Sequence, residues 1–314
     1  MKVSFLIPAF NAGTTLSRAV DSILNQHPSD LDYEIIIADD GSNDNTKEIS
    51  KKYADEYENV RYFFKENEGV SATRNFLVAQ AEGDYIIFVD SDDYVSETLL
   101  QDIQGCVKAD CDLIKWNPYI EDEYLKEISV PESKIVGIMT GEEAFNKLYG
   151  VEPLLCAVWL YAIRKDRIMQ FPDGRYHEDF AVMPLILLSS KKVAVLPDHE
   201  YHYIQTAYSI TRGNDEDKIK KRLNDMLVSF DNLVATADKM ELDKKTKENL
   251  AIYGTYSLIA ARKDLKKHEL LDKFYKDELK KRKLGKYIKA RNPKAFVKKV
   301  MISTSYKGKK AKHE

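Results

Sequence analysis

The sequence predicts an α/β protein with a mostly parallel central sheet flanked by helices. Over the first hundred residues, short runs of apolar, β-branched and aromatic residues alternate with longer stretches of helical periodicity. Such alternation with short connections is typical of βαβ units, which build parallel sheets. In addition, the predicted strands run into polar and acidic residues, and sheets of this kind bind ligands at the carboxyl ends of their strands.

The predicted elements follow in order along the chain. Four strands lie at Val3–Ile7, Glu34–Ala38, Val60–Phe64 and Tyr85–Val89, separated by helices at Thr14–Gln26, Asn45–Tyr57 and Gly69–Ala81. Next come a helix at Ser96–Val107, a strand at Asp112–Trp116, an irregular charged segment over 117–140 and a helix at Gly141–Tyr149. Further strands are predicted at Cys156–Ile163, Val193–Pro197 and Tyr201–Gln205. We divide the chain into an α/β domain (1–213), a helical region (214–290) and a basic tail (291–314).

Composition argues against several classes of protein. The chain has 314 residues, 44% of them hydrophobic, which suffices for one large domain and a smaller one. The longest apolar run, Ala181–Leu188, contains Pro184 and is far shorter than the ~18 residues of a membrane-spanning helix. The apolar stretch at the N-terminus is too short for a signal peptide. Three cysteines without C-x-x-C spacing predict neither a disulfide framework nor a zinc site, so we expect a cytoplasmic protein.

The charge is distributed unevenly along the chain. Residues 280–314 carry fourteen Lys or Arg and a single acid, whereas the remaining 279 residues carry 34 basic and 50 acidic side chains. Basic residues interleaved with apolar ones suit an anionic membrane surface, which would place the protein on the inner face of the membrane. A solvated tail, or packing on another subunit in an oligomer, is the alternative. Nucleic acid is not an expected partner because the acidic body would repel it.

An acidic turn follows the fourth predicted strand. Asp90-Ser91-Asp92-Asp93 puts three carboxylates within four residues, where they repel one another unless a cation lies between them. Hard oxygen ligands on a loop suit Mg²⁺ or Mn²⁺, which keep open positions for phosphate oxygens. The structural alternative is an acidic turn in which Asp93 or Ser96 caps the next helix.

Two further polar segments belong to the same edge of the predicted sheet. Asp39-Asp40-Gly41-Ser42 ends the second strand, and a carboxylate there can accept the imide N–H of a uracil ring; an Asp-Gly turn is the alternative. Arg74 lies one turn into the helix that begins at Gly69, where a fixed cation can meet a nucleotide or orient a carboxylate. Its alternative is a surface ion pair.

These motifs, in this order, resemble glycosyltransferase family 2, whose members have the GT-A fold. The resemblance runs from Val3–Asn11 through Asp39–Ser42, Asn67-Glu68-Gly69 and Ala72–Asn75 to Gly83–Asp93, and it is weaker up to Arg212. It implies a GT-A catalytic domain over 1–213 and a nucleotide-sugar donor, with uridine as the expected nucleoside. It assigns Pro8, Ala9, Asp40, Asn67, Arg74 and Asp90 to the nucleotide and Asp90 and Asp92 to the metal, and it adds Phe10, Gly69, Ser91 and Asp93 to the site.

The resemblance also implies a catalytic base. Inverting members carry an E-D motif, which His177-Glu178-Asp179 matches, so that Asp179 takes the position of the base and Glu178 lies beside it. The acceptor hydroxyl must lose its proton as it attacks the anomeric carbon, and a carboxylate can take it. Trp159 could stack on a sugar or be a core aromatic residue. Arg212 could neutralise the diphosphate. The implied acceptor is a saccharide or a lipid-linked molecule in bacterial surface-polymer assembly.

Other functions fit the sequence less well. Residues 8–13 lack the G-x-G-x-x-G of a nicotinamide dehydrogenase, and the chain has no P-loop motif. A nucleotidyltransferase would leave the E-D motif without a role. The remaining alternative is an inactive protein that binds a nucleotide-sugar and acts as a scaffold at a membrane or on nucleic acid; the intact set Asp90, Asp92 and Asp179 argues against it. His199 and His202 have loose metal spacing, and we expect them to serve packing.

Overall fold

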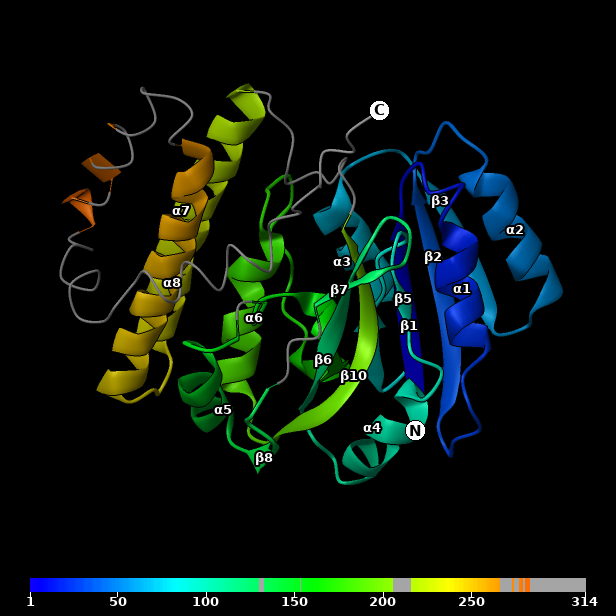
Figure 1. Cartoon of the computed structure of the whole chain (residues 1–314), viewed down its shortest axis with the longest axis horizontal. Helices are drawn as coiled ribbons and strands as arrows, with labels where there is room; N and C mark the ends of the chain where they lie inside the picture. The colour runs from blue at the N-terminus through cyan, green and yellow to red at the C-terminus, as the bar shows by residue number, and fades with distance from the viewer. Residues whose placement is uncertain are drawn as a thin grey trace, which may run out of the picture.

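The computed structural model describes residues 1–129, 133–152, 154–205 and 216–265, together with 273, 277, 278 and 280–282. Within these ranges, a ten-stranded sheet has the order β3-β2-β1-β4-β9-β6-β10-β5, and β7 and β8 pair with β6 and β10 (Figure 1). Strands β1 to β4 are parallel, so their carboxyl ends lie along one edge of the sheet. Strand β9 is antiparallel to β4 and β6, and β10 is parallel to β6. The predicted mostly parallel α/β sheet is confirmed.

The first hundred residues fold as predicted. The elements are β1 (Lys2–Ala9), α1 (Leu16–Leu24), β2 (Asp32–Asp40), α2 (Thr46–Glu56), β3 (Val60–Lys65), α3 (Val70–Gln80) and β4 (Tyr85–Phe88). Helices α1 and α2 lie on one side of the sheet and α3 on the other (Figure 1). The side chains of β1, β2 and β4 are buried on both sides, which explains their nearly continuous apolar sequences.

The second half departs from the prediction in several places. It contains β5 (Tyr94–Val95), α4 (Leu99–Lys108), β6 (Leu113–Asp122), β7 (Glu127–Ser129), β8 (Gly137–Met139), α5 (Gly141–Leu148), the 3-10 helix η1 (Val158–Leu160), β9 (Tyr161–Arg164), the 3-10 helix η2 (Lys165–Arg167), α6 (Glu178–Ser189), β10 (Val193–Gln205), α7 (Glu216–Lys239) and α8 (Lys244–Leu265). The irregular segment predicted over 117–140 is therefore wrong, because β6 continues to Asp122 and is followed by β7 and β8. Polar residues are tolerated in β6 because they find partners: the Asn117 side-chain amide donates to the Pro197 carbonyl at 2.8 Å.

Three other differences concern residues 156–205. Helix α6 was not predicted because it is apolar and buried on almost every side, which removes the amphipathic period, and because it contains Pro184. The strands predicted at Val193–Pro197 and Tyr201–Gln205 form the single strand β10, whose pairing with β6 shifts register between Val195 and Tyr201. The strand predicted at Cys156–Ile163 is shorter, since η1 occupies its middle.

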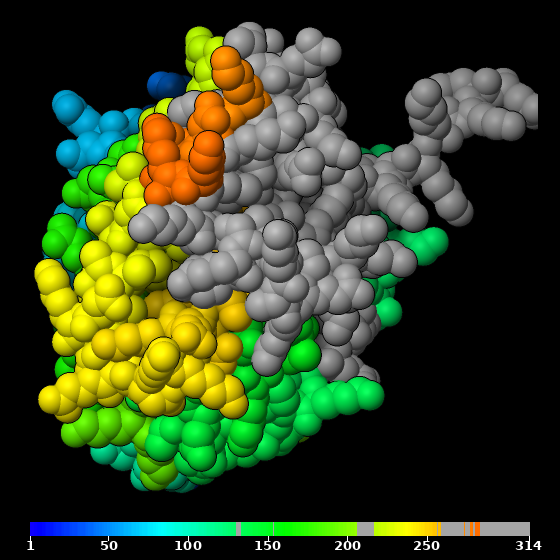
Figure 2. All heavy atoms as spheres, turned by 90° about the vertical axis from the view of Figure 1, so that its left-hand side faces the viewer, coloured from blue at the N-terminus to red at the C-terminus, as the bar shows by residue number. Residues whose placement is uncertain are grey.

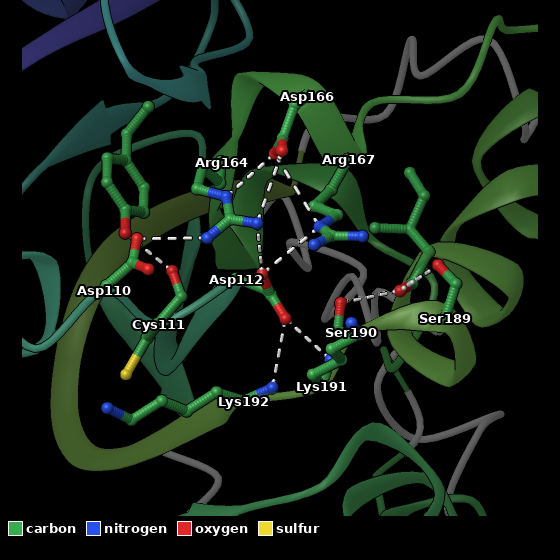
Figure 3. Close-up of polar contacts among 12 residues, drawn as sticks. Asp110, Cys111, Asp112, Arg164, Asp166, Arg167, Ser189, Ser190, Lys191 and Lys192 are labelled. Carbon is green, nitrogen blue, oxygen red and sulfur yellow. Dashed lines mark hydrogen bonds and ion pairs between the residues drawn. The ribbon is translucent and has the colours of Figure 1, made fainter.

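The buried carboxylate of Asp112 links three segments of the chain at the edge of the sheet where β6 begins (Figure 3). Asp112 accepts hydrogen bonds from the backbone N–H groups of Lys191 and Lys192 at 2.6 and 3.1 Å. Its other oxygen lies 2.7 Å from Arg164 and 3.2 Å from Arg167. The side chain thus joins the start of β6 to the end of β9 and to the start of β10.

We expect Asp112→Ala to destabilise the protein by about 2–4 kcal/mol, because it removes the acceptor of two part-buried backbone N–H groups and one carboxylate partner from each of two guanidinium groups. Thermal unfolding followed by circular dichroism measures this as a loss of several degrees in Tm. Asp110→Asn is the matched control: Asp110 is largely exposed and pairs with the same Arg164 at 3.0 Å, so its loss should cost less than about 1 kcal/mol. Equal effects of the two substitutions would contradict this role for Asp112.

The C-terminal helices α7 and α8 pack on the α/β domain. The residues predicted to share one face of α7, Leu223, Met226, Leu227, Phe230 and Leu233, are all buried and belong to the same apolar core as the sheet. On α8, Asn249 accepts from the Tyr149 hydroxyl at 2.9 Å. Figure 2 shows α7 and α8, in yellow-green and yellow, at the left of this face of the molecule. The predicted boundary at 213 and the tail 291–314 lie outside the described residues. No helix in the described ranges is long and apolar enough to span a bilayer.

Candidate active site

The loops that follow β1, β2 and β3 are tied to one another. The backbone N–H of Asn11 donates to the Ser42 hydroxyl at 2.8 Å, and the Asn11 side chain accepts from the Asn43 N–H at 2.9 Å. Gly41 has a φ of 78°, and a Cβ there would lie 2.9 Å from the backbone nitrogen of Asn67. The glycine of this motif is therefore required both by backbone conformation and by the close approach of the next loop.

Asp40, assigned to the nucleotide, organises the neighbouring loop. Its carboxylate accepts from Lys65 Nζ at 2.7 Å and from the backbone N–H groups of Glu68 and Gly69 at 3.0 and 2.8 Å. Asn67 donates from its side chain to the Asp40 carbonyl at 2.9 Å. Asp40 is almost fully buried, whereas Asn67 is exposed. Asp40 thus fixes the loop on which Asn67 is presented to solvent.

The acidic turn divides into two roles. Asp93 is buried and accepts from the Tyr201 hydroxyl at 2.9 Å and from the Ile204 N–H at 2.7 Å, so it anchors the turn to β10 and faces away from solvent. The Tyr201 hydroxyl also accepts from the Asp90 N–H at 3.0 Å. Asp92, in contrast, is exposed, and Arg18 donates to its carbonyl. Surrounding protein and the charge of Asp90 raise the pKa of the Asp92 carboxyl to about 6.

Arg74 joins the acidic turn to the E-D motif. Its guanidinium pairs with Asp90 at 3.0 Å and, through the other terminal nitrogen, with Glu178. The side chain is buried, and its Cζ lies 5.8 Å from the ring centres of both Phe88 and Phe171. The surface ion pair considered from the sequence is therefore wrong. Two motifs separated by more than eighty residues in the chain lie on either side of one cation.

Asp179 lies at the amino terminus of α6, beside this ion pair. Burial, and then the charge of Glu178, raise the pKa of its carboxyl to about 7, while Arg74 opposes the rise. One oxygen accepts from the Phe180 N–H at 2.7 Å. His177, just before the helix, has a φ of 59° and turns the chain into it. A carboxyl poised near neutral pH is suited to accept a proton.

The sequence predicts that Asp90 and Asp92 hold a metal ion. In the described ranges, no cluster of three or more His, Cys, Asp or Glu side chains could hold a metal ion. The surrounding protein, and then the charge of Asp90, nevertheless raise the pKa of the Asp92 carboxyl to about 6, and a neighbouring cation would oppose that rise. One or two carboxylates, completed by phosphate oxygens of the substrate, are the usual protein share of a Mg²⁺ site. These two residues therefore fit a metal that arrives with a diphosphate.

The remaining predicted residues are placed as follows. Phe10 is half-exposed at the end of β1, whereas Ala9 is buried, and Pro8, Gly69 and Ser91 are partly buried. Trp159 is only 6% exposed and stacks on Tyr201 at 4.4 Å between ring centroids and on Tyr203 at 5.1 Å, the packing of a core aromatic residue. Arg212 lies outside the described residues. His202 stacks between Tyr94 and Tyr119, which confirms that it serves packing.

Sequence reasoning missed Tyr201 and Arg18. Both hydrogen-bond directly to the acidic turn although they lie far from it in the sequence, and neither stands in a recognisable motif. The only signal for Tyr201 was the strand predicted over Tyr201–Gln205, which placed it in the sheet without indicating its partner.

Fold and site together define an α/β protein with an acidic site at the carboxyl edge of a mostly parallel sheet. Residues 4–157 match Glycosyl transferase family 2. Glycosyltransferase GlyG of Streptococcus pneumoniae is 31% identical over 67% of this chain and 73% of its own length. This chain therefore belongs to glycosyl transferase family 2.

Two other relatives indicate the range of the family. The cholesterol galactosyltransferase of Borreliella burgdorferi is 31% identical over 67% of this chain, which spans 62% of that protein. The poly(ribitol-phosphate) beta-N-acetylglucosaminyltransferase TarP of Staphylococcus aureus is 28% identical over 88% of this chain and 85% of its own. Among solved structures, S. aureus TarS 1–349 in complex with UDP-GlcNAc has a TM-score of 0.61 at 20% identity, covering 83% of this chain and 72% of that one. This likeness confirms the expected GT-A fold.

Proposed function

We propose that this protein is an inverting glycosyltransferase that moves a sugar from a UDP-sugar to an acceptor hydroxyl in the assembly of a bacterial cell-surface polymer. The observation that carries the proposal is the placement of Arg74, which pairs with Asp90 on one side and with Glu178, the neighbour of Asp179, on the other. The donor-side and acceptor-side motifs of the family thus converge on one site. The structural likeness to TarS bound to UDP-GlcNAc supports a UDP-sugar as the donor.

Each side chain has a role in this proposal. Asp40 fixes the loop of Asn67, which would lie around the nucleoside, and Phe10 has a half-exposed ring after the end of β1. Asp90 and Asp92 would hold Mn²⁺ or Mg²⁺ together with the diphosphate; the metal supplies stabilisation of charge on the leaving group. Asp179 accepts the proton of the acceptor hydroxyl as that oxygen attacks the anomeric carbon. Arg74 keeps Asp90 and Glu178 in place and offsets part of their charge.

The names of the relatives suggest which sugar and which acceptor the enzyme uses. The names of the relatives include a galactosyltransferase and an N-acetylglucosaminyltransferase, so a hexose and an N-acetylhexosamine both have support. Two relatives, TarP and the poly(ribitol-phosphate) beta-glucosyltransferase of Bacillus spizizenii, act by name on poly(ribitol phosphate). We therefore propose a saccharide or polyol-phosphate acceptor carried on a lipid or polymer.

A panel of nucleotide-sugars tests the proposal directly. The purified protein is incubated with UDP-Glc, UDP-Gal, UDP-GlcNAc and UDP-GalNAc in Mn²⁺, and release of UDP is measured with and without polymer acceptors. Acceptor-dependent release from one donor is the expected result. Binding of UDP-sugar without release under all conditions would instead favour an inactive scaffold protein.

For the tail, we propose attachment to an anionic membrane at the inner face, which would bring the site to a lipid-linked acceptor. Each basic residue near such a surface contributes about 1 kcal/mol, so a few of the fourteen in residues 280–314 suffice for reversible binding. We expect the full chain to sediment with phosphatidylglycerol vesicles at low salt and to be released at high salt.

The control is a chain that ends at Leu279, which keeps the acidic body and lacks the basic residues. It should stay in the supernatant with the same vesicles, and neither protein should sediment with neutral phosphatidylcholine. If the two chains behave alike, the tail is a solvated segment without this role.

A further inference from the structure

The segment before the E-D motif has no regular structure, yet it determines where Asp179 lies. It runs from Phe171 to His177 and contains two residues in left-handed conformations, Gly174 with a φ of 66° and His177 with a φ of 59°. For a non-glycine residue this conformation costs about 1–2 kcal/mol and persists only where surrounding contacts impose it. The contacts that hold this segment are therefore contacts that position Asp179.

At its beginning, the segment is held by α3. The side-chain amide of Asn75 accepts from the Phe171 N–H at 2.9 Å and donates to the Phe171 carbonyl at 2.8 Å. Asn75 also donates to Asp173 at 3.1 Å. At its end, Glu178 is held by Arg74 of the same helix. The middle of the segment must be held from elsewhere.

That support comes from the C-terminal helix α7. Asp225 accepts from the Tyr176 N–H at 3.0 Å and from Lys221 Nζ at 2.6 Å. Lys221 in turn donates to the Gly174 carbonyl at 2.6 Å, and its ammonium lies 4.9 Å from the centre of the Tyr176 ring. Asp225 and Lys221 lie one helical turn apart and hydrogen-bond to the backbone on both sides of Arg175. Asp225 is mostly buried, so its bonds are little weakened by water.

We infer that Asp225 and Lys221 are positioning residues for the catalytic base, a role that rests on the function proposed above. They fix the backbone of residues 174–176, and the left-handed turn at His177 carries that position on to Asp179. The helical region is then part of the machinery of transfer, although it lies outside the matched residues 4–157. A base displaced by about 1 Å can lose up to roughly 10²-fold in rate, while donor binding at the opposite side of the site is unaffected.

The test compares Asp225→Asn and Lys221→Met with Asp231→Asn. Asp231 lies on the same helix, is half-exposed and pairs with Arg282, so it controls for a change of charge on α7. We expect Asp225→Asn to lower kcat by about 10–100-fold while the Kd for UDP in Mn²⁺ stays within twofold of wild type. Lys221→Met should also lower kcat, and Asp231→Asn should leave kcat unchanged. Thermal unfolding checks that each variant is folded. Lys221 is half-exposed, so its variant keeps the test valid if Asp225→Asn does not fold.

A double substitution separates positioning from general damage to the fold. If Asp225 acts through the base, adding Asp225→Asn to Asp179→Asn should lower the residual rate no further. A kcat of Asp225→Asn within twofold of wild type, or the same fractional loss in both backgrounds, would overturn the inference. Failure of the proposed function gives a different result: the wild-type protein would release no UDP from any donor, or Asp179→Asn would be fully active.

Discussion

Asp179→Asn should lower kcat by about 10²–10⁴-fold and leave the affinity for UDP in Mn²⁺ nearly unchanged, since only proton transfer is lost. The amide has nearly the shape of the carboxylate and can still accept from the Phe180 N–H, so the start of α6 should be preserved. Steady-state kinetics with the active donor, together with calorimetric titration of UDP, measures both quantities. Asp166→Asn, on an exposed residue at the far edge of the sheet, is the control for general effects.

The same residue predicts a dependence on pH. Because the folded protein raises the pKa of Asp179 to about 7, the base is increasingly protonated as the pH falls below that value. The kcat/KM of the wild type should therefore fall towards tenfold per pH unit on the acid side of its pH profile, and the Asn variant should lack this fall.

The product must also have inverted configuration, so that an α-linked donor yields a β-linked product by NMR. An α-linked product would rule out Asp179 as the base of an inverting reaction.

Asp92→Asn should abolish measurable turnover and weaken donor binding only in the presence of the metal. Removing one of two carboxylates deprives the diphosphate of a correctly held cation, and stabilisation of several kcal/mol at the leaving group corresponds to a loss of roughly 10³-fold or more. Titration of UDP in Mn²⁺ and in EDTA measures the effect. The wild type should bind UDP more weakly in EDTA than in Mn²⁺. In EDTA, the wild type and the variant should bind UDP with the same affinity.

Asp84→Asn serves as the control for this substitution. Asp84 lies just before β4, at the opposite end of the strand that leads to the acidic turn, and it accepts from the Lys2 N–H at 2.9 Å. Its variant should retain activity and metal-dependent binding. Near wild-type transfer by Asp92→Asn would show that the two carboxylates at this turn do not hold the metal.

The sequence predicts the first half of the fold well because that half is built from local signals. Each strand there is rich in apolar, β-branched or aromatic residues, each helix has its own period, and the loops between them are short. Helix α6 has no such signal: it is buried on nearly all sides and contains Pro184, so its periodicity is lost. The charged part of β6 was misread because its polar side chains find partners far away in the chain: Asn117 donates to the Pro197 carbonyl of β10, and Glu121 accepts from the Tyr94 hydroxyl of β5.

The site could be predicted in its residues but not in its contacts. The motifs identify Asp90, Asp92 and Asp179, yet nothing local indicates that Arg74 lies between Asp90 and Glu178. Nor does the sequence distinguish Asp93, which is turned inward toward Tyr201, from its neighbour Asp92, which faces solvent. Both distinctions depend on β10 and α6, elements that reach the site from more than eighty residues away.

The pairing of β10 with β6 has a consequence for how the protein is made. Strand β6 lies between β9 and β10, and β10 ends only at Gln205. A nascent chain that has emerged only to residue 157 therefore has β6 without β9 and β10, because β9 begins at Tyr161, and only the short β7 pairs with its end. Most backbone donors and acceptors of β6 and its apolar side chains then lack their partners, a state that favours aggregation. We therefore expect folding during synthesis to complete late, after β10 has left the ribosome, and chaperones to meet the chain before that point.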